Sequence, residues 1–144
     1  MSTPFALPDP TTEAGARLAE RLDTELIAWL TTVNAAGQPQ SSAVWFVWAD
    51  GELLMYSRLG APRSRNIAAN PHVSVHLNSD PEGDDIVTFE AQARLDPAAP
   101  PASAVPAFLA KYGKLIANYG WSAEQFVADY PDAIRIRPTR LRLG

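Results

Sequence analysis

Three arginines and two serines lie close together near the middle of this 144-residue sequence. They are Ser57, Arg58, Arg63, Ser64 and Arg65. Guanidinium and hydroxyl groups bind phosphate, and the unpaired N–H groups at the start of a helix bind it as well. These residues therefore predict a phosphate-binding site. The alternative interpretation is that three arginines on a surface loop simply face water.

The pattern around these residues predicts a strand followed by a short helix. The apolar stretch 53–57 is typical of a strand, and Pro62 suits the first helical position because its missing N–H would be unpaired there anyway. Asn70-Pro71 then ends the helix. Arg63 and Arg65 fall in its first turn, where the helix dipole disfavours each cation by roughly 0.3–1 kcal/mol. Two cations in this position favour an anion bound nearby.

Composition and charge limit the classes of protein to which this chain can belong. With 47% hydrophobic and 19% charged residues, the sequence is that of a compact folded protein, and its length suits one domain. The net charge of −4 argues against general binding to nucleic acid, which needs a basic surface. The chain has no cysteine, so disulfides and thiol chemistry are excluded.

The sequence gives no sign of a segment that directs the chain to a membrane. Residues 1–10 lack the basic start and apolar core of a signal peptide, and we expect them to form a flexible lead. No apolar run approaches the roughly 20 residues of a membrane helix. We therefore expect a cytoplasmic protein without a membrane partner.

Familiar catalytic and nucleotide-binding motifs are missing from the chain. It contains no Gly-x-Gly-x-x-Gly, no Gly-x-x-x-x-Gly-Lys-Ser/Thr and no Gly-x-Ser-x-Gly. His72 and His76 fall on a predicted strand, where four residues span about 13 Å, too far for one metal ion. We interpret them as structural or solvent-facing, with a substrate-facing proton donor as the alternative. Pro81 and Gly83 within the acidic run 80–85 favour a solvated turn over a calcium site.

The order of the predicted elements favours an antiparallel sheet with helices outside it. Periodicity, caps and turns predict a helix from Thr11 or Thr12, strands over 26–33, 41–48 and 53–57, the helix from Pro62, strands over 72–78 and 86–95, a helical segment over 98–131 and a final strand pair about Pro138. Repeated β-α-β units are missing, which disfavours a doubly wound parallel sheet. We therefore predict a mainly β (α+β) fold, a small antiparallel barrel with peripheral helices, as one domain over 1–144.

A helix start is predicted within the helical segment. Ser122-Ala123-Glu124-Gln125 matches a capping box, and Trp121 with Phe126 matches the hydrophobic staple that accompanies it. We therefore interpret Trp121 as structural.

One predicted strand is apolar on both faces. The residues at 44–48, Val-Trp-Phe-Val-Trp, do not alternate with polar residues, so both faces need cover. One face belongs to the core, and the other predicts a partner subunit or a flat ligand. Cover by the chain's own helices is the alternative. Since no nucleophile, acid–base pair or metal cluster is evident, any catalysis belongs to a bound cofactor, and a phosphorylated flat heterocycle suits this pattern.

Several short segments together resemble a known superfamily. They are 30–39 (LTTVNAAGQP), 42–46 (SAVWF), 56–57 (YS), 63–67 (RSRNI) and 70–73 (NPHV). In order and spacing they resemble the pyridoxamine 5′-phosphate oxidase-like split β-barrel superfamily, and more closely its actinobacterial branch of F420 (deazaflavin)-dependent oxidoreductases. The resemblance covers residues 26–144. It implies an FMN-binding split barrel of about six to seven antiparallel strands with peripheral helices.

The resemblance also implies which residues bind the cofactor phosphate. In the family a basic residue, followed three positions later by asparagine, contacts the phosphate, and this pattern maps onto Arg63 and Asn66. The neighbouring candidates are Ser57, Arg58, Ser64 and Arg65. The family's basic residue is frequently lysine, and arginine keeps the charge while adding a bidentate fork.

A second group of cofactor residues follows from the same resemblance. In the family the strand before the phosphate loop lies along the ring system of the cofactor. It maps onto Ser42, Ala43, Val44 and Trp45. No catalytic side chain and no metal ligand is implied.

The identity of the cofactor is implied less directly. Relatives use FMN, deazaflavin F420 or haem on one scaffold, so the fold alone does not choose among them. F420 carries a phosphate and an acidic glutamate tail that suit additional arginines, so we expect F420, with FMN as the alternative. Members are typically homodimers with two sites at the interface.

The implied reaction is hydride transfer between reduced deazaflavin and a conjugated or electron-poor small molecule. The alternatives are an FMN-binding enzyme like pyridoxamine phosphate oxidase and a non-catalytic protein that binds or stores a flavin or deazaflavin.

Overall fold

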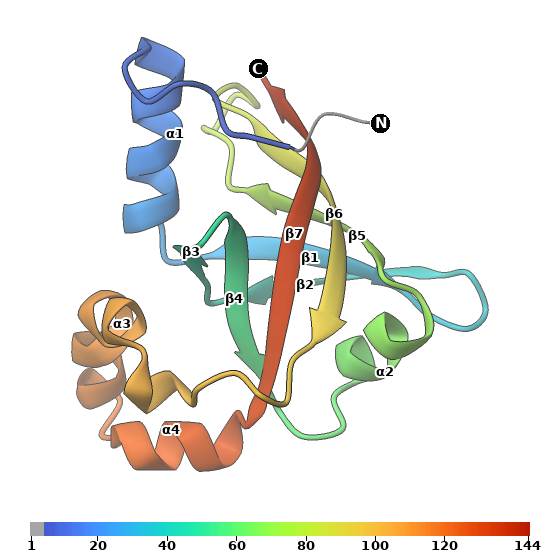
Figure 1. Ribbon diagram of the computed structural model, residues 1–144, viewed down its shortest axis with the longest axis vertical. Helices are drawn as coiled ribbons and strands as arrows, with labels where there is room; N and C mark the ends of the chain where they lie inside the picture. Colours follow the sequence, from blue (N-terminus) through green and yellow to red (C-terminus); the bar gives the residue numbers. More distant parts are fainter. Residues whose placement is uncertain (1–4) are drawn as a thin grey trace.

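The fold is a seven-stranded antiparallel sheet with α-helices at its periphery, which confirms the predicted split barrel (Figure 1). It is described for residues 5–144 in a computed structural model. The strands are β1 (Ala28–Val33), β2 (Pro39–Val44), β3 (Val47–Ala49), β4 (Glu52–Ser57), β5 (His72–Leu77), β6 (Val87–Leu95) and β7 (Asp132–Leu143). The helices are α1 (Glu13–Thr24), α2 (Pro62–Ala69), the short 3₁₀ turn η1 (Ala102–Ala104), α3 (Pro106–Asn118) and α4 (Ala123–Asp129). Within this described part of the chain, no helix is long and apolar enough to cross a membrane.

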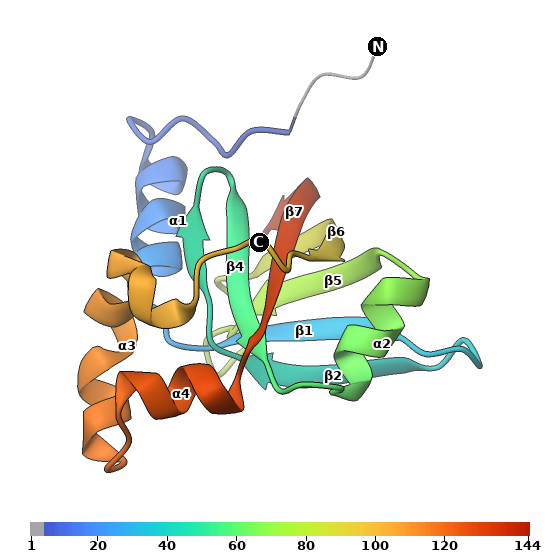
Figure 2. The same cartoon turned by 60° about the horizontal axis from the view of Figure 1, so that its bottom comes forward.

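The barrel is split at one point. The strand order is β2-β1-β5-β6-β7-β4-β3, so the two edge strands, β2 and β3, are neighbours in the sequence. In Figure 2, β2 runs beside β1, whereas β3 rises beside β4. The predicted strand over 41–48 is therefore wrong as a single element. A bend at Trp45 and Phe46 divides it, because each half pairs with a different strand.

The bend leaves backbone groups of Phe46 without a strand partner, and α3 supplies partners for them. The N–H of Phe46 donates to Tyr112 Oη at 2.8 Å, and Lys111 Nζ donates to the Phe46 carbonyl at 2.9 Å. Tyr112 is fully buried, and burial raises the pKa of its hydroxyl. The edge of the barrel therefore depends on a helix that lies more than 60 residues away in the sequence.

Apolar side chains form two cores. The first fills the barrel and includes Leu30, Met55, Val75, Phe89 and Ile134. The second lies between the sheet and helices α3 and α4, and it includes Val47, Leu54, Tyr56, Phe108 and Tyr112. The chain's own helices therefore cover part of the doubly apolar segment 44–48, which was the alternative interpretation.

The C-terminal segment is one strand, and the predicted strand pair about Pro138 is wrong. Strand β7 pairs with β6 on one side and β4 on the other. The register with β6 shifts between Glu90 and Ala91, which lie opposite Arg140 and Pro138. Thr139 is thus left without an opposite residue, and its hydroxyl donates to the Glu90 carbonyl at 3.1 Å. A bulge of this kind accommodates a proline, which cannot donate to the ladder.

Several element ends follow the local signals in the sequence. The Thr12 hydroxyl accepts from the N–H of Gly15 at the start of α1, and the Ser122 hydroxyl accepts from the N–H of Gln125 at the start of α4. Asp50-Gly51, with φ of 55° and 77°, forms the turn between β3 and β4.

The predicted flexible lead, 1–10, falls partly outside the described residues. Residues 1–4 are not described. Further along, the Phe5 ring packs edge-on against Phe89 with centroids 6.3 Å apart, and Leu7 also packs against the barrel core.

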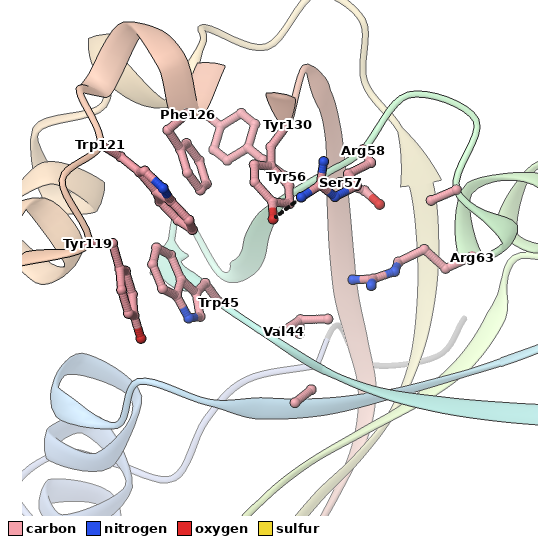
Figure 3. A pocket seen from close by; sticks show the side chains of 12 residues that line it. Val44, Trp45, Tyr56, Ser57, Arg58, Arg63, Tyr119, Trp121, Phe126 and Tyr130 are labelled. Atoms are coloured by element: carbon pink, nitrogen blue, oxygen red, sulfur yellow. Dashed lines mark hydrogen bonds between the residues drawn. The ribbon is translucent and has the colours of Figure 1, made fainter. Parts of the chain in front are cut away.

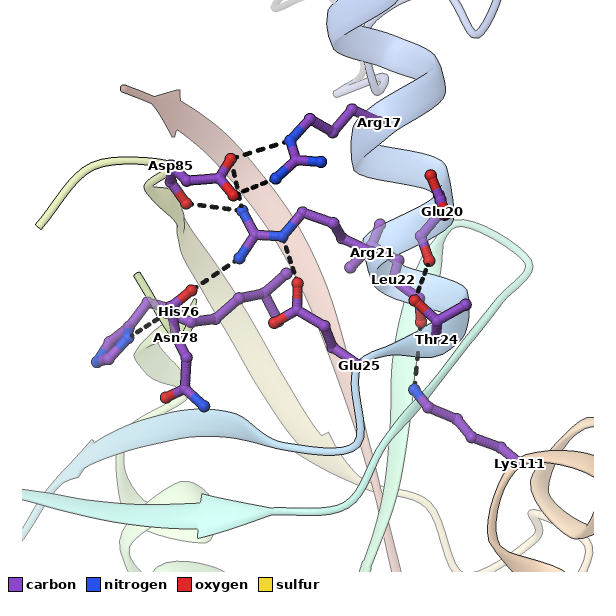
Figure 4. Close-up of polar contacts among 11 residues, drawn as sticks. Arg17, Glu20, Arg21, Leu22, Thr24, Glu25, His76, Asn78, Asp85 and Lys111 are labelled. Carbon is purple, nitrogen blue, oxygen red and sulfur yellow. Dashed lines mark hydrogen bonds and ion pairs between the residues drawn. The ribbon is translucent and has the colours of Figure 1, made fainter. Parts of the chain in front are cut away.

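A buried arginine ties α1 to the acidic loop between β5 and β6 (Figure 4). Arg21 donates to the carbonyls of Asn78 and Asp85 at 2.7 Å each, and it pairs with Glu25. Arg17 pairs with the Asp85 carboxylate, and this hydrogen bond holds the pKa of that carboxyl below its usual value. The loop is thus fixed to α1 by charge and by backbone contacts.

Candidate functional site

A cavity of about 360 Å³ lies beside the bend of the barrel (Figure 3). Its lining comes from the end of β2, the end of β4, the start of α2 and the segment that contains α4. The lining residues are Ala43, Val44, Trp45, Tyr56, Ser57, Arg58, Ala61, Arg63, Tyr119, Trp121, Phe126 and Tyr130. Segments that are far apart in the sequence therefore meet at this cavity.

One side of the cavity carries a buried hydroxyl without a partner. Ser57, the last residue of β4, is 2% exposed, and its Oγ has no hydrogen-bond partner among the described residues. Ser64 Oγ in α2 is buried and unpartnered in the same sense. A buried polar group left unpaired costs about 1–3 kcal/mol. A polar ligand in the cavity would relieve this cost at Ser57.

Arg63 adds a positive charge on the same side. No carboxylate of the described residues lies within 4.0 Å of its guanidinium. Burial lowers the pKa of Arg63, yet an arginine stays protonated at neutral pH. Helix α2 begins at Pro62, as predicted, and Ala61 provides no side-chain cap. A half-buried cation at an uncapped helix start suits an anion.

Arg58 is held at the edge of the cavity by Tyr130. Its Nη2 donates to Tyr130 Oη at 3.1 Å, and its guanidinium carbon lies 4.7 Å from the centre of the tyrosine ring. The loop after β4 is thus tied to the segment between α4 and β7. Arg58 is exposed, and this contact uses only one of its five N–H groups.

The other side of the cavity is aromatic. The rings of Trp45 and Phe126 are nearly parallel, 9° apart with centroids at 5.8 Å, and Phe126 stacks on Tyr130 at 4.7 Å. Tyr119 and Trp121 pack together with centroids 5.0 Å apart, and they are 58% and 38% exposed. Flat side chains in such an array suit a flat conjugated ligand.

A comparison with protein families identifies the group to which the chain belongs. The sequence matches the family model described as Pyridoxamine 5′-phosphate oxidase over residues 15–143. The chain belongs to this family. No curated protein shows significant similarity to it.

Solved structures in this family have the same fold. An F420 reductase gives a TM-score of 0.63 at 27% identity, with 85% of this chain and 94% of that chain covered. A conserved hypothetical protein from Mycobacterium tuberculosis gives 0.69 at 21% identity, with 96% and 88% covered. The haem storage protein HutZ from Vibrio cholerae gives 0.63 at 20% identity, with 89% and 92% covered. At these lower identities the last two support the fold alone.

The structure brings together part of the predicted cofactor site. Of the predicted residues, those that line the cavity are Ala43, Val44, Trp45, Ser57, Arg58 and Arg63. The remaining four, Ser42, Ser64, Arg65 and Asn66, lie outside its lining. Arg65 donates to the Gly60 carbonyl at 2.6 Å, and Asn66 donates to the side chains of Thr32 and Gln40 at 3.0 and 2.9 Å. The predicted phosphate contact of Asn66 stays a prediction.

Half of the lining was not predicted from the sequence. The residues concerned are Tyr56, Ala61, Tyr119, Trp121, Phe126 and Tyr130. Trp121 and Phe126 were assigned to a helix cap, which accounts for two aromatic residues but not for Tyr119 and Tyr130. The signal that was available was this density of aromatic residues over 119–130.

The two histidines of β5 lie away from the cavity lining. His76 stacks on Trp29 with ring centroids 6.4 Å apart, and its Nδ1 lies 3.0 Å from the Leu77 carbonyl oxygen. His72 is exposed. These positions agree with the interpretation of the two histidines as structural or solvent-facing.

The residues present fit a flavin-type cofactor. Within residues 5–144 the Ser57 hydroxyl and the Arg63 guanidinium have no partner, so both can bind a phosphate, and Trp45 offers a flat surface to a ring system. The same cavity therefore provides both halves of the site that such a group needs.

Proposed function

We propose that this protein is an F420-dependent oxidoreductase that transfers a hydride between the deazaflavin and a conjugated or electron-poor small molecule. The observation that carries the proposal is the unpartnered Ser57 hydroxyl in the same cavity as the unpaired Arg63 charge and an aromatic wall. A ligand that is anionic at one end and flat at the other satisfies all three features.

Each group of residues has a distinct task in this proposal. Arg63 and Ser57 bind the phosphate, and Arg58 adds charge at the rim. Val44 and Trp45 orient the ring system, while Trp121 and Phe126 exclude water from it. When bound, F420 supplies the hydride from its reduced deazaflavin ring. The protein's contribution is binding, orientation and a dry surface.

The preference for F420 over FMN rests on the F420 reductase, the structure reported above that exceeds 25% identity. An acidic cofactor tail also suits Arg58, which lies exposed at the rim. FMN carries the phosphate and the flat ring, but it has no comparable tail.

The proposal also includes a homodimer. Strand β1 turns Trp29, Thr31 and Val33 away from the barrel core, and Trp29 lies opposite Ala43 of β2. Ala43 is exposed and also lines the cavity, so a second copy placed on this face would border the cofactor site. Light scattering after gel filtration should give twice the chain mass. Thr31→Arg should give a monomer with weaker cofactor binding, and a tight-binding monomeric parent protein would contradict the dimer.

The cofactor assignment is tested by titrating the purified protein with F420 and with FMN while recording tryptophan fluorescence. Trp45 and Trp121 line the cavity, so binding should quench their emission. Arg63→Ala removes a charge-assisted contact worth about 1.5–3 kcal/mol and should weaken F420 binding by roughly ten- to a hundred-fold.

Arg65→Ala is the matched control, because Arg65 lies in the same helical turn but donates to the Gly60 carbonyl. It should leave F420 affinity within about twofold. The ligand-free Arg63→Ala protein should melt at or slightly above the parent temperature, because the substitution removes a cation from the first helical turn. Selective binding of FMN would overturn the choice of cofactor. Equal losses of F420 affinity in Arg63→Ala and Arg65→Ala would place the phosphate elsewhere.

Enzymatic activity is tested separately from binding. Reduced F420 should be oxidised over many turnovers by a quinone, a nitroaromatic compound or an unsaturated ketone. Binding without turnover across these acceptors would favour a storage or carrier protein instead.

A further inference from the structure

A second cavity, of about 440 Å³, lies where α1 and α3 meet β3. None of the described residues lines both this cavity and the cofactor cavity. Three of its lining residues are alanines, Ala19 on α1 and Ala107 and Ala110 on α3, and these small side chains leave the space open. The function proposed above makes no use of this cavity.

The lining of this second cavity combines apolar side chains with two charged ones. Leu22 from α1 and Val47 from β3 are buried beside it, and Trp48 also lines it, while the charged members are Asp23 and Lys111. A cavity of several hundred cubic ångströms that combines apolar side chains with a small number of charged groups is typical of a small-molecule site.

The charged side chain that lines the cavity from α3 is Lys111. It donates to the Leu22 carbonyl at 3.2 Å, which Figure 4 shows, and to the Phe46 carbonyl at 2.9 Å. Its Nζ also lies 3.7 Å from the centre of the Phe46 ring. An ammonium has three N–H groups, so beyond these two carbonyls the third has only the weak acceptor offered by the Phe46 ring.

The charge of Lys111 is not neutralised by direct pairing. No carboxylate oxygen within residues 5–144 lies within 4.0 Å of Nζ. Asp23, an exposed residue that also lines the cavity, and Glu25 act on Lys111 only at longer range. A half-buried cation without a carboxylate partner, beside a cavity with apolar side chains, is suited to a ligand that brings its own anion.

We propose that this second cavity binds a small apolar carboxylic acid, such as a medium-chain fatty acid. The carboxylate accepts the Lys111 N–H that otherwise faces the Phe46 ring, and the hydrocarbon body lies against Leu22, Val47 and Trp48. This inference is independent of the proposed function, because the two cavities use different residues.

Octanoate is the probe for this site, and 1-octanol is the matched ligand without a charge. We expect octanoate to bind at micromolar to low millimolar concentration, to change Trp48 fluorescence and to raise the melting temperature. We expect 1-octanol to bind at least tenfold more weakly. Equal binding of the two ligands, or no binding of octanoate, would overturn the proposal.

Three variants locate the binding site of octanoate. Lys111→Met keeps the length and the apolar stem and should weaken octanoate at least tenfold. Ala110→Leu fills the cavity while leaving Lys111 in place, and it should also abolish binding, so the test survives if Lys111→Met folds poorly. Arg63→Ala changes the cofactor cavity only and should bind octanoate normally. If Arg63→Ala lost octanoate binding while Ala110→Leu bound octanoate normally, the assignment to the second cavity would be refuted and the acid would occupy the cofactor site.

A pH series provides a further check. Burial lowers the pKa of Lys111 to about 8, while Asp23 and Glu25 act in the opposite direction. Octanoate affinity should therefore fall as the pH rises through this value, because the amine loses its charge. The neighbouring Tyr112 hydroxyl has a raised pKa and stays protonated over this range. Octanoate affinity that is the same at pH 7 and pH 9.5 would contradict the role of Lys111.

Discussion

Replacing Tyr112 by phenylalanine tests how the split in the barrel is stabilised. The Tyr112 hydroxyl accepts the N–H of Phe46 at 2.8 Å and lies 2.8 Å from the Leu26 carbonyl oxygen. The substitution removes one oxygen atom and keeps the ring, which stacks on Trp45 at a centroid distance of 4.6 Å. The variant therefore loses the hydrogen bonds while it keeps the aromatic packing.

The expected cost follows from which groups are left without partners. Phe46 is 1% exposed, so its N–H cannot turn to water, and an unpaired buried donor costs about 1–3 kcal/mol. The Phe46 carbonyl keeps its hydrogen bond from Lys111 at 2.9 Å and adds little to the cost. We therefore expect Tyr112→Phe to lower the free energy of unfolding by about 1–3 kcal/mol.

Tyr56→Phe is the matched control. The Tyr56 hydroxyl donates to the carbonyl of Pro100, an exposed residue whose carbonyl water can reach after the change. The control should therefore lose less than about 1 kcal/mol. Urea unfolding of the parent and both variants, with equal m-values, measures the difference. A Tyr112→Phe protein that is no less stable than Tyr56→Phe would refute the role of the hydroxyl in closing the bend.

Three further predictions concern stability. Ser57→Ala removes an unpartnered hydroxyl, so the ligand-free protein should melt at or above the parent temperature in a thermal scan, whereas a lower value would reveal a hidden hydrogen bond. Gly15→Ala should lower the melting temperature because its Cβ would meet the carbonyl oxygen of Asp9 at 2.0 Å. Gly113→Ala lies in open space on α3 and should raise stability by about 0.5–1 kcal/mol. A Gly15→Ala protein that melts above Gly113→Ala would contradict the packing of the lead. A hydrogen bond from an arginine of β7 holds the pKa of Asp96 below its usual value, so the stabilisation by Asp96 is present above the unfolded-state pKa and is lost as the pH falls through the lower folded value. Asp96→Asn should therefore lower stability at pH 7, and its difference in stability from the parent should shrink below about pH 4. A difference in stability that does not depend on pH would show that the charge of Asp96 is not its cause.

Local chemistry in the sequence was sufficient to predict many of the element boundaries. The Asp50-Gly51 turn, the proline at the start of α2 and the Ser122 cap each act through backbone conformation or a hydrogen bond within a few residues. For this reason the antiparallel order of strands and the outer helices could be inferred without tertiary information.

Two strand predictions failed where pairing between distant segments overrides the local pattern. Residues 41–48 have a continuous strand pattern, but the chain bends at Trp45 because β2 and β3 have different partners. Pro138 predicts an interruption, but β7 continues through it because a bulge opposite β6 absorbs the missing N–H. Neither outcome can be read from neighbours in the sequence.

The candidate site divides in the same way. The sequence alone determined that Ser57, Arg58 and Arg63 lie around a strand end and a helix start, because that placement depends on short-range signals. Arg63 and Arg65 are two helical positions apart and therefore point about 200° apart, so one helix face cannot carry both. Only the tertiary structure decided that Arg63 lines the cavity while Arg65 turns back to the Gly60 carbonyl. Packing of α3 and α4 on the sheet likewise brings the aromatic residues of 119–130 to the basic residues of 57–63, because burial of apolar surface joins segments between which the sequence contains no local signal.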